Sequence, residues 1–259
     1  MRRAVLSPPA CIVTWRNVAL VQNEDMRERL MREAKTLAKM SHPNIPAIYD
    51  VNFDSDRMLI YFEFIEGENL REIINSGVVP SIQQVVPWFT QVALALDHAS
   101  KLGIIHRDIK PENIIVLHNR TAAYLVDFGI ALVPDEIRRL SPAGYVIGTP
   151  AYMSPEQRDG EDLETASDIY SLGLTLYETL SGNLPWVGQP YAPLSDANEA
   201  IPPSIDELIR ASIAPSRTNR LNSAREFAKR LQGAFRTDIP LSKLLVDAPL
   251  HVLQSARLT

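Results

Sequence analysis

The apolar positions of this 259-residue chain follow two different spacings. Near the start, residues 25–40 repeat Met26, Leu30 and Leu37 at helical spacing, and the helix should end before Pro43 because the residue before a proline avoids helical angles. Four runs rich in β-branched or aromatic residues predict short strands, at 11–15, 18–21, 45–51 and 58–64. The first quarter of the chain is therefore predicted to be strand-rich with one helix.

From residue 66 onward the pattern becomes helical. Ser81 is predicted to cap a long helix that ends at Gly103, and Pro87 either kinks this helix or marks its effective start. Further helices are predicted at 168–181, closed by Gly182, and at 205–213 and 223–235. This order predicts an α+β fold with a small strand-rich lobe (1–65), a large helical lobe (66–235) and a cleft between them. The tail, 236–259, either packs as a last helix or hangs free.

Composition narrows the range of partners. With 31 acidic and 26 basic residues the net charge is -5, so no global positive field draws the chain to nucleic acid or anionic membranes. The single cysteine, Cys11, cannot form an internal disulfide, and no apolar run reaches the roughly 18 to 20 residues of a membrane span. We expect a cytoplasmic protein with neither nucleic acid nor a membrane span.

Oxygen-bearing side chains gather in two short strings. Asp108 and Asn113 stand five positions apart, in the string His106-Arg107-Asp108-Ile109-Lys110-Pro111-Glu112-Asn113, and Asp127 opens Asp127-Phe128-Gly129. Such ligands suit Mg²⁺ bound to phosphates, and phosphoryl transfer asks a protein mainly for positioning and charge stabilisation. A single loop aspartate is more often a cap or turn residue, but both strings together favour catalysis.

These strings resemble the catalytic loop and metal-binding triplet of protein kinases, in the Ser/Thr form found in bacteria, and the match runs from about Glu33 to Glu226. The resemblance implies that Asp108 orients the substrate hydroxyl and Lys110 neutralises the transferring phosphate. It implies that Asn113 and Asp127 hold Mg²⁺, with ATP as the phosphate donor and proteins as substrates. Lys110 at its position points to Ser/Thr hydroxyls.

The same resemblance implies a nucleotide site between residues 58 and 70. Phe62 would be the gatekeeper, the carbonyl of Glu63 and the amide of Ile65 would meet the adenine edge, and Ile115 would floor the pocket. The alternative is that this segment is an ordinary edge strand that binds no ligand.

Other matches imply structural roles. Phe128 and His106 would stack with Leu37 and Ile48 into an apolar column between the lobes. Residues 148–156 resemble the end of an activation segment, in which Thr149 would hydrogen-bond Asp108 and Lys110. The remaining roles are a buried ion pair of Glu156 with Arg220 and a brace from Asp168 to the catalytic-loop backbone.

Arg107 suggests regulation, because kinases with an arginine before the catalytic aspartate are usually switched by phosphorylation. Ser141 is the first candidate for the phosphorylated residue, followed by Tyr145 and Thr149. An ordinary solvated serine is an equally good interpretation of Ser141.

The small lobe departs from the family pattern. Glu33 matches the helix glutamate that pairs with a strand lysine, yet the first lysine is Lys35 and the first glycine is Gly67. Val21 stands where the lysine is expected, and Arg16 would fit the pairing geometry poorly. Either the first strands are missing from this sequence, or the chain is a pseudokinase that acts as a regulatory or binding module.

A second departure lies between Trp186 and Ile201, where a usual docking helix is short or absent. A small-molecule phosphotransferase of related fold is a third hypothesis. It is disfavoured by Thr149 and by the string Ser154-Pro155-Glu156, which are typical of peptide binding.

Overall fold

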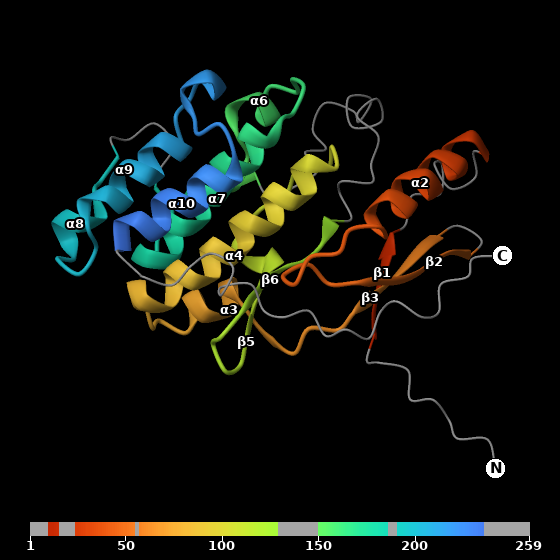
Figure 1. Cartoon of the computed structure of the whole chain (residues 1–259), viewed down its shortest axis with the longest axis horizontal. Helices are drawn as coiled ribbons and strands as arrows, with labels where there is room; N and C mark the ends of the chain where they lie inside the picture. Colours follow the sequence, from red (N-terminus) through yellow and green to blue (C-terminus); the bar gives the residue numbers. More distant parts are fainter. Residues whose placement is uncertain (1–9, 16–23, 55–56, 129–149, 186–190, 236–259) are drawn as a thin grey trace, which may run out of the picture.

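Three antiparallel strands form a sheet at one end of the molecule (Figure 1). The computed structural model describes residues 10–15, 24–54, 57–128, 150–185 and 191–235. The middle strand pairs with both others, Val13 opposite Ile60 and Ile60 opposite Val51. The strands are β1 (Ala10–Trp15), β2 (Ile48–Asp54) and β3 (Arg57–Glu63).

Helix α2 (Glu24–Leu37) lies beside this sheet (Figure 1). Glu24 and Asp25 in its first turn and Lys35 in its last turn complement the helix dipole. Leu37 is buried in the same core as Met58 and Ile60 of β3. The helix ends three residues before the predicted Met40, whose N–H instead bonds to the Leu37 carbonyl at 2.9 Å in a tighter turn.

The loop after α2 ties the small sheet to the helical part of the molecule. Asn44 donates from Nδ2 to the Ala123 carbonyl at 2.9 Å, and its own carbonyl accepts from Leu125 N–H at 2.9 Å. The predicted start of this strand at Ile45 is wrong. The Ile45 N–H bonds to the His42 carbonyl in a turn, and β2 begins only at Ile48.

Two histidines meet where this loop rests on the large lobe. The rings of His42 and His98 lie 5.5 Å apart, and Nδ1 of His42 accepts a hydrogen bond from Asn44 N–H at 3.1 Å. Burial lowers the pKa of His42 and the nearby His98 lowers it further, whereas Asp97 raises it; the resulting pKa is about 4. His42 is therefore neutral at pH 7.

The long helix α4 (Ile82–Lys101) runs through the large lobe and is buried along most of its length. It begins after Ser81, as predicted, and Gly103 follows its end with a φ of 74°. Pro87 lies inside the helix without ending it. Trp88 is anchored by a hydrogen bond from Nε1 to the Arg120 carbonyl at 3.0 Å.

A second small sheet was not predicted. Its strands are only three or four residues long, too short to show a periodic pattern. A Cβ on Gly67 would lie 2.3 Å from the Val116 carbonyl oxygen, so only glycine permits this pairing. The strands are β4 (Gly67–Asn69), β5 (Ile114–Leu117) and β6 (Ala123–Leu125).

Of the remaining long helices, two pack against α4 and the third packs against those two. α7 (Thr165–Ser181) starts three residues before the prediction, because Glu164 precedes it as the cap, and it ends at Gly182 with a φ of 76°. α9 (Pro203–Ser212) starts two residues early, since proline fits the first turn of a helix. α10 (Ala224–Phe235) agrees with the prediction to one residue.

A strand-rich small lobe and a helical large lobe confirm the two-lobed α+β class. The lobe bounds 1–65 and 66–235 stay a prediction.

The helix expected to be short before Ile201 is a single turn, α8 (Leu194–Ala197). Asp206 of α9 holds it by accepting from Leu194 N–H at 2.7 Å, Ser195 N–H at 3.0 Å and the Tyr191 hydroxyl at 2.6 Å. None of the helices in the described ranges is both long and apolar enough to cross a bilayer.

Candidate active site

The backbone before Asp108 is held by a buried carboxylate. Asp168, in the first turn of α7, accepts from His106 N–H through Oδ2 and from Arg107 N–H through Oδ1, each at 2.8 Å. Burial raises the pKa of Asp168, and the two N–H groups oppose that shift by favouring the ionised form. The bracing contact predicted for Asp168 is present.

Arg107 itself has a left-handed backbone, with a φ of 72°. A side chain disfavours this conformation, which costs roughly 1 to 3 kcal/mol and is found mainly where surrounding contacts impose it. One of these contacts comes from α6 (Pro155–Arg158), where Gln157 Nε2 donates to the Arg107 carbonyl at 2.7 Å. Sequence reasoning missed Gln157, because its partner is 50 positions away.

Asp108, Lys110 and Asn113 meet around one carboxylate oxygen. Lys110 Nζ lies 2.7 Å and Asn113 Nδ2 3.0 Å from Asp108 Oδ2, and Nδ2 also donates to the Asp108 carbonyl at 2.8 Å. Asp108 is 7% exposed, and within the described ranges its Oδ1 has no hydrogen-bond partner. The carboxylate is thus fixed on one side and available to a hydroxyl on the other.

The residues expected to hold Mg²⁺ lie on adjoining strand ends. The Val126 N–H donates to the Asn113 carbonyl at 3.0 Å, which places Asp127 directly beyond Asn113. The Asp127 side chain is exposed and its backbone is left-handed, with a φ of 65°. Because Nδ2 of Asn113 faces Asp108, its Oδ1 is left for a cation.

This donor set fits Mg²⁺ bound together with phosphates. No group of three or more His, Cys, Asp or Glu side chains suited to a metal occurs among the residues that the structure covers. Mg²⁺ usually takes one or two carboxylates and completes its shell with water and phosphate oxygens. Two protein oxygens are therefore sufficient if a nucleotide supplies the rest.

Behind the site, the rings of His106 and Phe128 meet edge to face, with 4.5 Å between their centroids and an interplanar angle of 62°. His106 Nε2 is 3.0 Å from the Val126 carbonyl. Phe128 and Leu37 belong to one buried cluster, against which Ile48 packs. The predicted column thus joins the small sheet to the catalytic loop.

The expected adenine residues lie at the connection between the two lobes. Phe62 pairs with Cys11 and Ile48 inside the sheet, and Glu63 closes it with an N–H bond to the Ala47 carbonyl at 2.8 Å. Ile65 follows β3, is buried, and its N–H has no hydrogen-bond partner in the described parts of the chain. Ile115 is half-buried on β5, which pairs with β4 just beyond Ile65.

Glu156 of α6 and Arg220 form the buried ion pair predicted from the sequence. Nη1 is 2.6 Å from Oε1 and Nη2 is 2.8 Å from Oε2. The Ser167 hydroxyl donates to Oε1 at 2.6 Å. Burial opposes ionisation of Glu156, but these hydrogen bonds outweigh it and hold its pKa at about 2.

A second ion network around Arg71 was not predicted. Helix α3 (Leu70–Asn75) carries Arg71, whose Nε lies 2.9 Å from Glu112 Oε1 and whose Nη1 lies 2.8 Å from Glu178 Oε1. Its Nη2 also bonds to the Tyr152 hydroxyl, which bonds in turn to Glu178. The partners are 41, 81 and 107 positions from Arg71, so no local pattern announces them.

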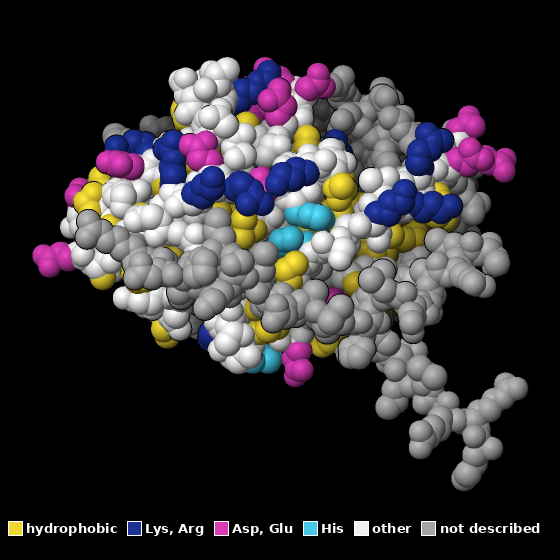
Figure 2. Space-filling model, viewed as in Figure 1, with side chains coloured by type: hydrophobic (Ala, Val, Ile, Leu, Met, Phe, Trp, Pro, Cys, Tyr) yellow, Lys and Arg dark blue, Asp and Glu magenta, His cyan; other side chains and the backbone are white. Residues whose placement is uncertain are grey.

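The basic side chains on the α4 and α10 side of the molecule form a row (Figure 2). Lys101 and Arg225 in these helices share the carboxylate of Asp97, at 2.7 and 3.0 Å. Burial raises the pKa of Asp97, but hydrogen bonds from Lys101 and Arg225 outweigh it and lower the pKa below its usual value. The pair of Asp97 with Arg225 joins α10 to α4, whereas the pair with Lys101 lies within α4.

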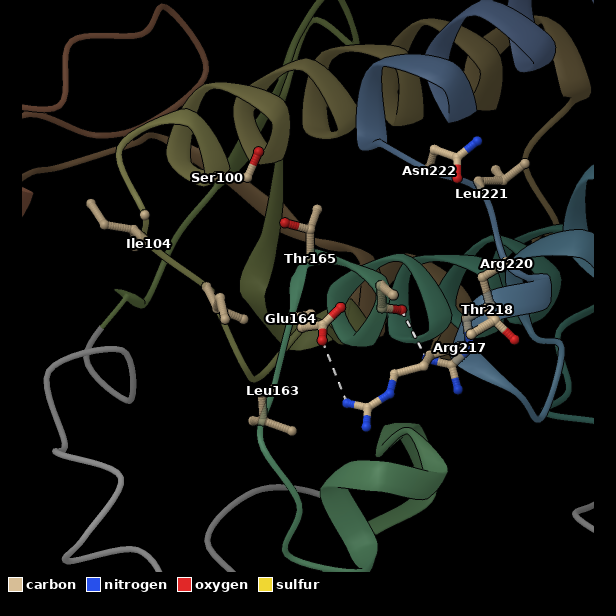
Figure 3. Close-up of a pocket in the computed structure, with 13 residues that line it drawn as sticks. Ser100, Ile104, Leu163, Glu164, Thr165, Arg217, Thr218, Arg220, Leu221 and Asn222 are labelled. Carbon is tan, nitrogen blue, oxygen red and sulfur yellow. Dashed lines mark hydrogen bonds and ion pairs between the residues drawn. The ribbon is translucent and has the colours of Figure 1, made fainter.

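A cavity of about 500 Å³ lies beside Ile104 and Ile105, which lead into the catalytic loop (Figure 3). It lies between the end of α4, residues 163–166 and residues 217–222, with Arg217 reaching toward Glu164 at 3.6 Å. Ile105, next to His106, lines it, whereas none of Asp108, Lys110, Asn113 or Asp127 does. The cavity is therefore separate from the candidate active site.

Several predicted residues lie outside the described ranges: Ser141, Tyr145, Thr149, Arg16 and the run Val18–Val21. Glu33 lies in α2, but the structure does not describe its side chain. β1, the described strand that precedes α2 and pairs with β3, contains no lysine.

Comparison with known proteins agrees with this geometry. The protein kinase domain family matches residues 3–232. The chain is 36% identical over 234 residues to the serine/threonine-protein kinase pkn3 of Myxococcus xanthus, covering 82% of this chain and 43% of that protein. It is 33% identical over 247 residues to the serine/threonine-protein kinase PknB of Mycobacterium leprae, covering 88% and 39%. The chain thus spans about two fifths of the length of these relatives.

A solved structure supports the fold. The kinase domain of Mycobacterium tuberculosis PknI superposes with a TM-score of 0.68 at 24% sequence identity, covering 87% of this chain and 84% of that one. At this identity the likeness shows the architecture alone.

Proposed function

Because the chain belongs to the protein kinase domain family, we propose that it transfers the γ-phosphate of ATP to Ser or Thr hydroxyls of proteins. The observation that carries the proposal is the carboxylate of Asp108, which Lys110 and Asn113 fix through Oδ2 and which has no partner at Oδ1 among the described residues. This is the arrangement that a hydroxyl nucleophile requires, since phosphoryl transfer depends on positioning and charge stabilisation.

In this mechanism Asp108 Oδ1 accepts the hydrogen bond of the substrate hydroxyl and takes its proton as the phosphoryl group is transferred. Lys110, 2.7 Å from Asp108 Oδ2, keeps the carboxylate in place. Its ammonium also stabilises negative charge on the transferring group.

Asn113 Oδ1 and the Asp127 carboxylate would hold Mg²⁺. When bound, the metal ion supplies charge neutralisation between the phosphate groups of ATP. The buried hydrogen bonds of Asn113 fix its side chain before any ligand binds.

The adenine would bind at the end of β3, where the Ile65 N–H and the Glu63 carbonyl lie next to Phe62. Ile115 supplies an apolar surface on β5. Glu33 of α2 is proposed on the phosphate side, as the helix glutamate of the family, although β1 offers it no lysine. We propose proteins and ATP as partners and a cytoplasmic location; the net charge of -5 argues against nucleic acid.

A regulatory or binding module without turnover is the second candidate. It is favoured by β1, which pairs with β3 ahead of α2 and contains no lysine.

Phosphate transfer from radiolabelled ATP to dephosphorylated casein, with fluorescent ATP binding measured in parallel, separates the two. A kinase incorporates phosphate in the presence of Mg²⁺, and Asp108→Asn abolishes incorporation while ATP still binds. Glu207→Gln, a matched carboxylate-to-amide change at an exposed position of α9, leaves incorporation unchanged. ATP binding without incorporation by the unmodified chain supports the module, and neither binding nor incorporation overturns the nucleotide site.

A further inference from the structure

The catalytic aspartate follows a residue whose backbone must be held from outside. Arg107 has a φ of 72°, and a non-glycine residue does not adopt this angle without support. Asp108 is attached to the carbonyl of Arg107, so the direction of its side chain depends on both backbone angles of Arg107.

Two side chains from different elements hold these two angles. The angle φ sets the peptide unit before the Arg107 Cα, whose N–H is bound by Asp168 Oδ1 at 2.8 Å. The angle ψ sets the peptide unit after it, whose carbonyl is bound by Gln157 Nε2 at 2.7 Å. Asp168 therefore controls one side of the residue and Gln157 the other.

Gln157 itself stands on a firmly held turn. Its N–H bonds to Ser154 Oγ at 3.3 Å, and the neighbouring Glu156 is locked to Arg220. The bond to Arg107 is the one hydrogen bond of the Gln157 side chain within the described ranges. Hence its amide serves the catalytic loop and not α6.

We infer that Gln157 is a positioning residue for Asp108. By donating to the Arg107 carbonyl it keeps the Arg107–Asp108 peptide unit in the orientation that points the carboxylate at the substrate hydroxyl. The Glu156–Arg220 pair fixes the position of α6, and the bond from Gln157 makes the orientation of Asp108 depend on that position. The inference rests on the proposed kinase function for its kinetic consequence, but the structural link stands without it.

The discriminating property is the ability to donate a hydrogen bond. Gln157→Glu keeps the size and replaces the donor with a carboxylate oxygen that repels the Arg107 carbonyl. Gln157→Met keeps the length without a donor, whereas Gln157→Lys restores one. Gln84→Met is the control, because Gln84 also binds a backbone group, accepting from Ser81 N–H at 3.0 Å, at the start of α4.

In steady-state kinetics with casein we expect kcat to fall about ten- to a hundredfold in Gln157→Glu and Gln157→Met, with KM for ATP and the melting temperature nearly unchanged. Gln157→Lys should recover most of kcat, and Gln84→Met should match the unmodified chain. The inference is overturned if Gln157→Glu has the same kcat as the unmodified chain, or if Gln157→Lys is as slow as Gln157→Met.

Hydrogen–deuterium exchange tests the same link without turnover. The amides of residues 106–109 should exchange faster in Gln157→Met than in the unmodified chain and in Gln84→Met. If the unmodified chain incorporates no phosphate, the kinase proposal fails while exchange still decides the role of Gln157. If the exchange rates of residues 106–109 are the same in Gln157→Met and in the unmodified chain, the positioning role of Gln157 is overturned.

Discussion

Arg220 and Glu156 form a bidentate ion pair in the interior of the large lobe, with the Arg220 side chain 0% and the Glu156 side chain 5% exposed. All five N–H groups of Arg220 are used: two face Glu156, and the others reach the carbonyls of Ala166, Ala214 and Pro215 at 2.8 to 3.0 Å. Its guanidinium also lies 4.9 Å from the Tyr170 ring centroid. The pair fixes α6 against α7, so its loss should disturb both elements.

Arg220→Met should lower the free energy of unfolding by about 3 to 5 kcal/mol, because it leaves a buried carboxylate without its cation. Urea denaturation measures this. Arg217→Met is the matched control, since Arg217 makes longer and more exposed ion pairs with Glu161 and Glu164, at 3.3 and 3.6 Å. Its loss should be below about 1 kcal/mol. Equal losses in the two variants would contradict the assignment of the buried pair.

The same pair should make stability depend on pH in acid. The pKa of Glu156 is about 2 in the folded chain, against 4.5 as its ordinary value, so the unfolded chain binds the proton more readily. The stabilisation, of the order of 3 kcal/mol, is complete above about pH 4.5 and is lost as pH falls toward 2. In denaturation at several pH values, Glu156→Gln should lack this component. Parallel pH profiles for the two chains would refute it.

Contacts encoded in short strings were the ones that the sequence could predict. Asp108, Lys110 and Asn113 lie within six consecutive residues, and the loop that connects them leaves few ways to arrange the three side chains. The Glu156–Arg220 pair and the Asp168 brace span 64 and at least 61 positions, and only the family resemblance indicated them. Gln157 and Arg71 have no such guide, because their partners are set by tertiary packing.

The secondary structure shows the same division. α4, α7 and α10 have long apolar stripes and clear caps, and the sequence located them to within about three residues. β4 and β6 have three residues each and are defined by the strand beside them. β2 begins three residues later than the prediction, because Ile45 is apolar but its N–H belongs to a turn.

His42 should produce a second pH dependence, nearer neutrality. Its pKa of about 4 in the folded chain lies below its ordinary 6.5, because burial and the adjacent His98 disfavour the charged ring and Asp97 only partly compensates. Since the unfolded chain then binds the proton more tightly, stability is complete above about pH 6.5 and falls as pH drops through 4. Thermal melts should show this fall in the unmodified chain and not in His42→Gln. His98→Gln, which removes one of the two causes, should shift the midpoint upward. A midpoint that does not move in His98→Gln would show that the ring contact has no effect on His42.

Arg71 should couple the turn that contains Tyr152 to the catalytic loop. Its side chain is 25% exposed and neutralises Glu178, which is 6% exposed, while Nε holds Glu112 beside Asn113. Arg71→Met leaves two carboxylates and the Tyr152 hydroxyl without their shared cation, and we expect a loss of about 2 to 3 kcal/mol in the free energy of unfolding. Because Glu112 is next to Asn113, the Mg²⁺ concentration for half-maximal phosphate transfer should also rise.

Arg120→Met provides the control for Arg71. Arg120 lies in the turn between β5 and β6, at the end of this hairpin opposite to Asn113 and Asp127, and forms an ion pair with Glu68 at 2.5 Å between side chains that are 35% and 42% exposed. Its loss should cost below about 1 kcal/mol and leave the Mg²⁺ dependence unchanged.

In the double variant Arg71→Met, Glu178→Gln, the buried negative charge is gone, so stability should partly recover relative to Arg71→Met alone. Strictly additive losses in this cycle would show that the pairing of Arg71 with Glu178 does not stabilise the fold.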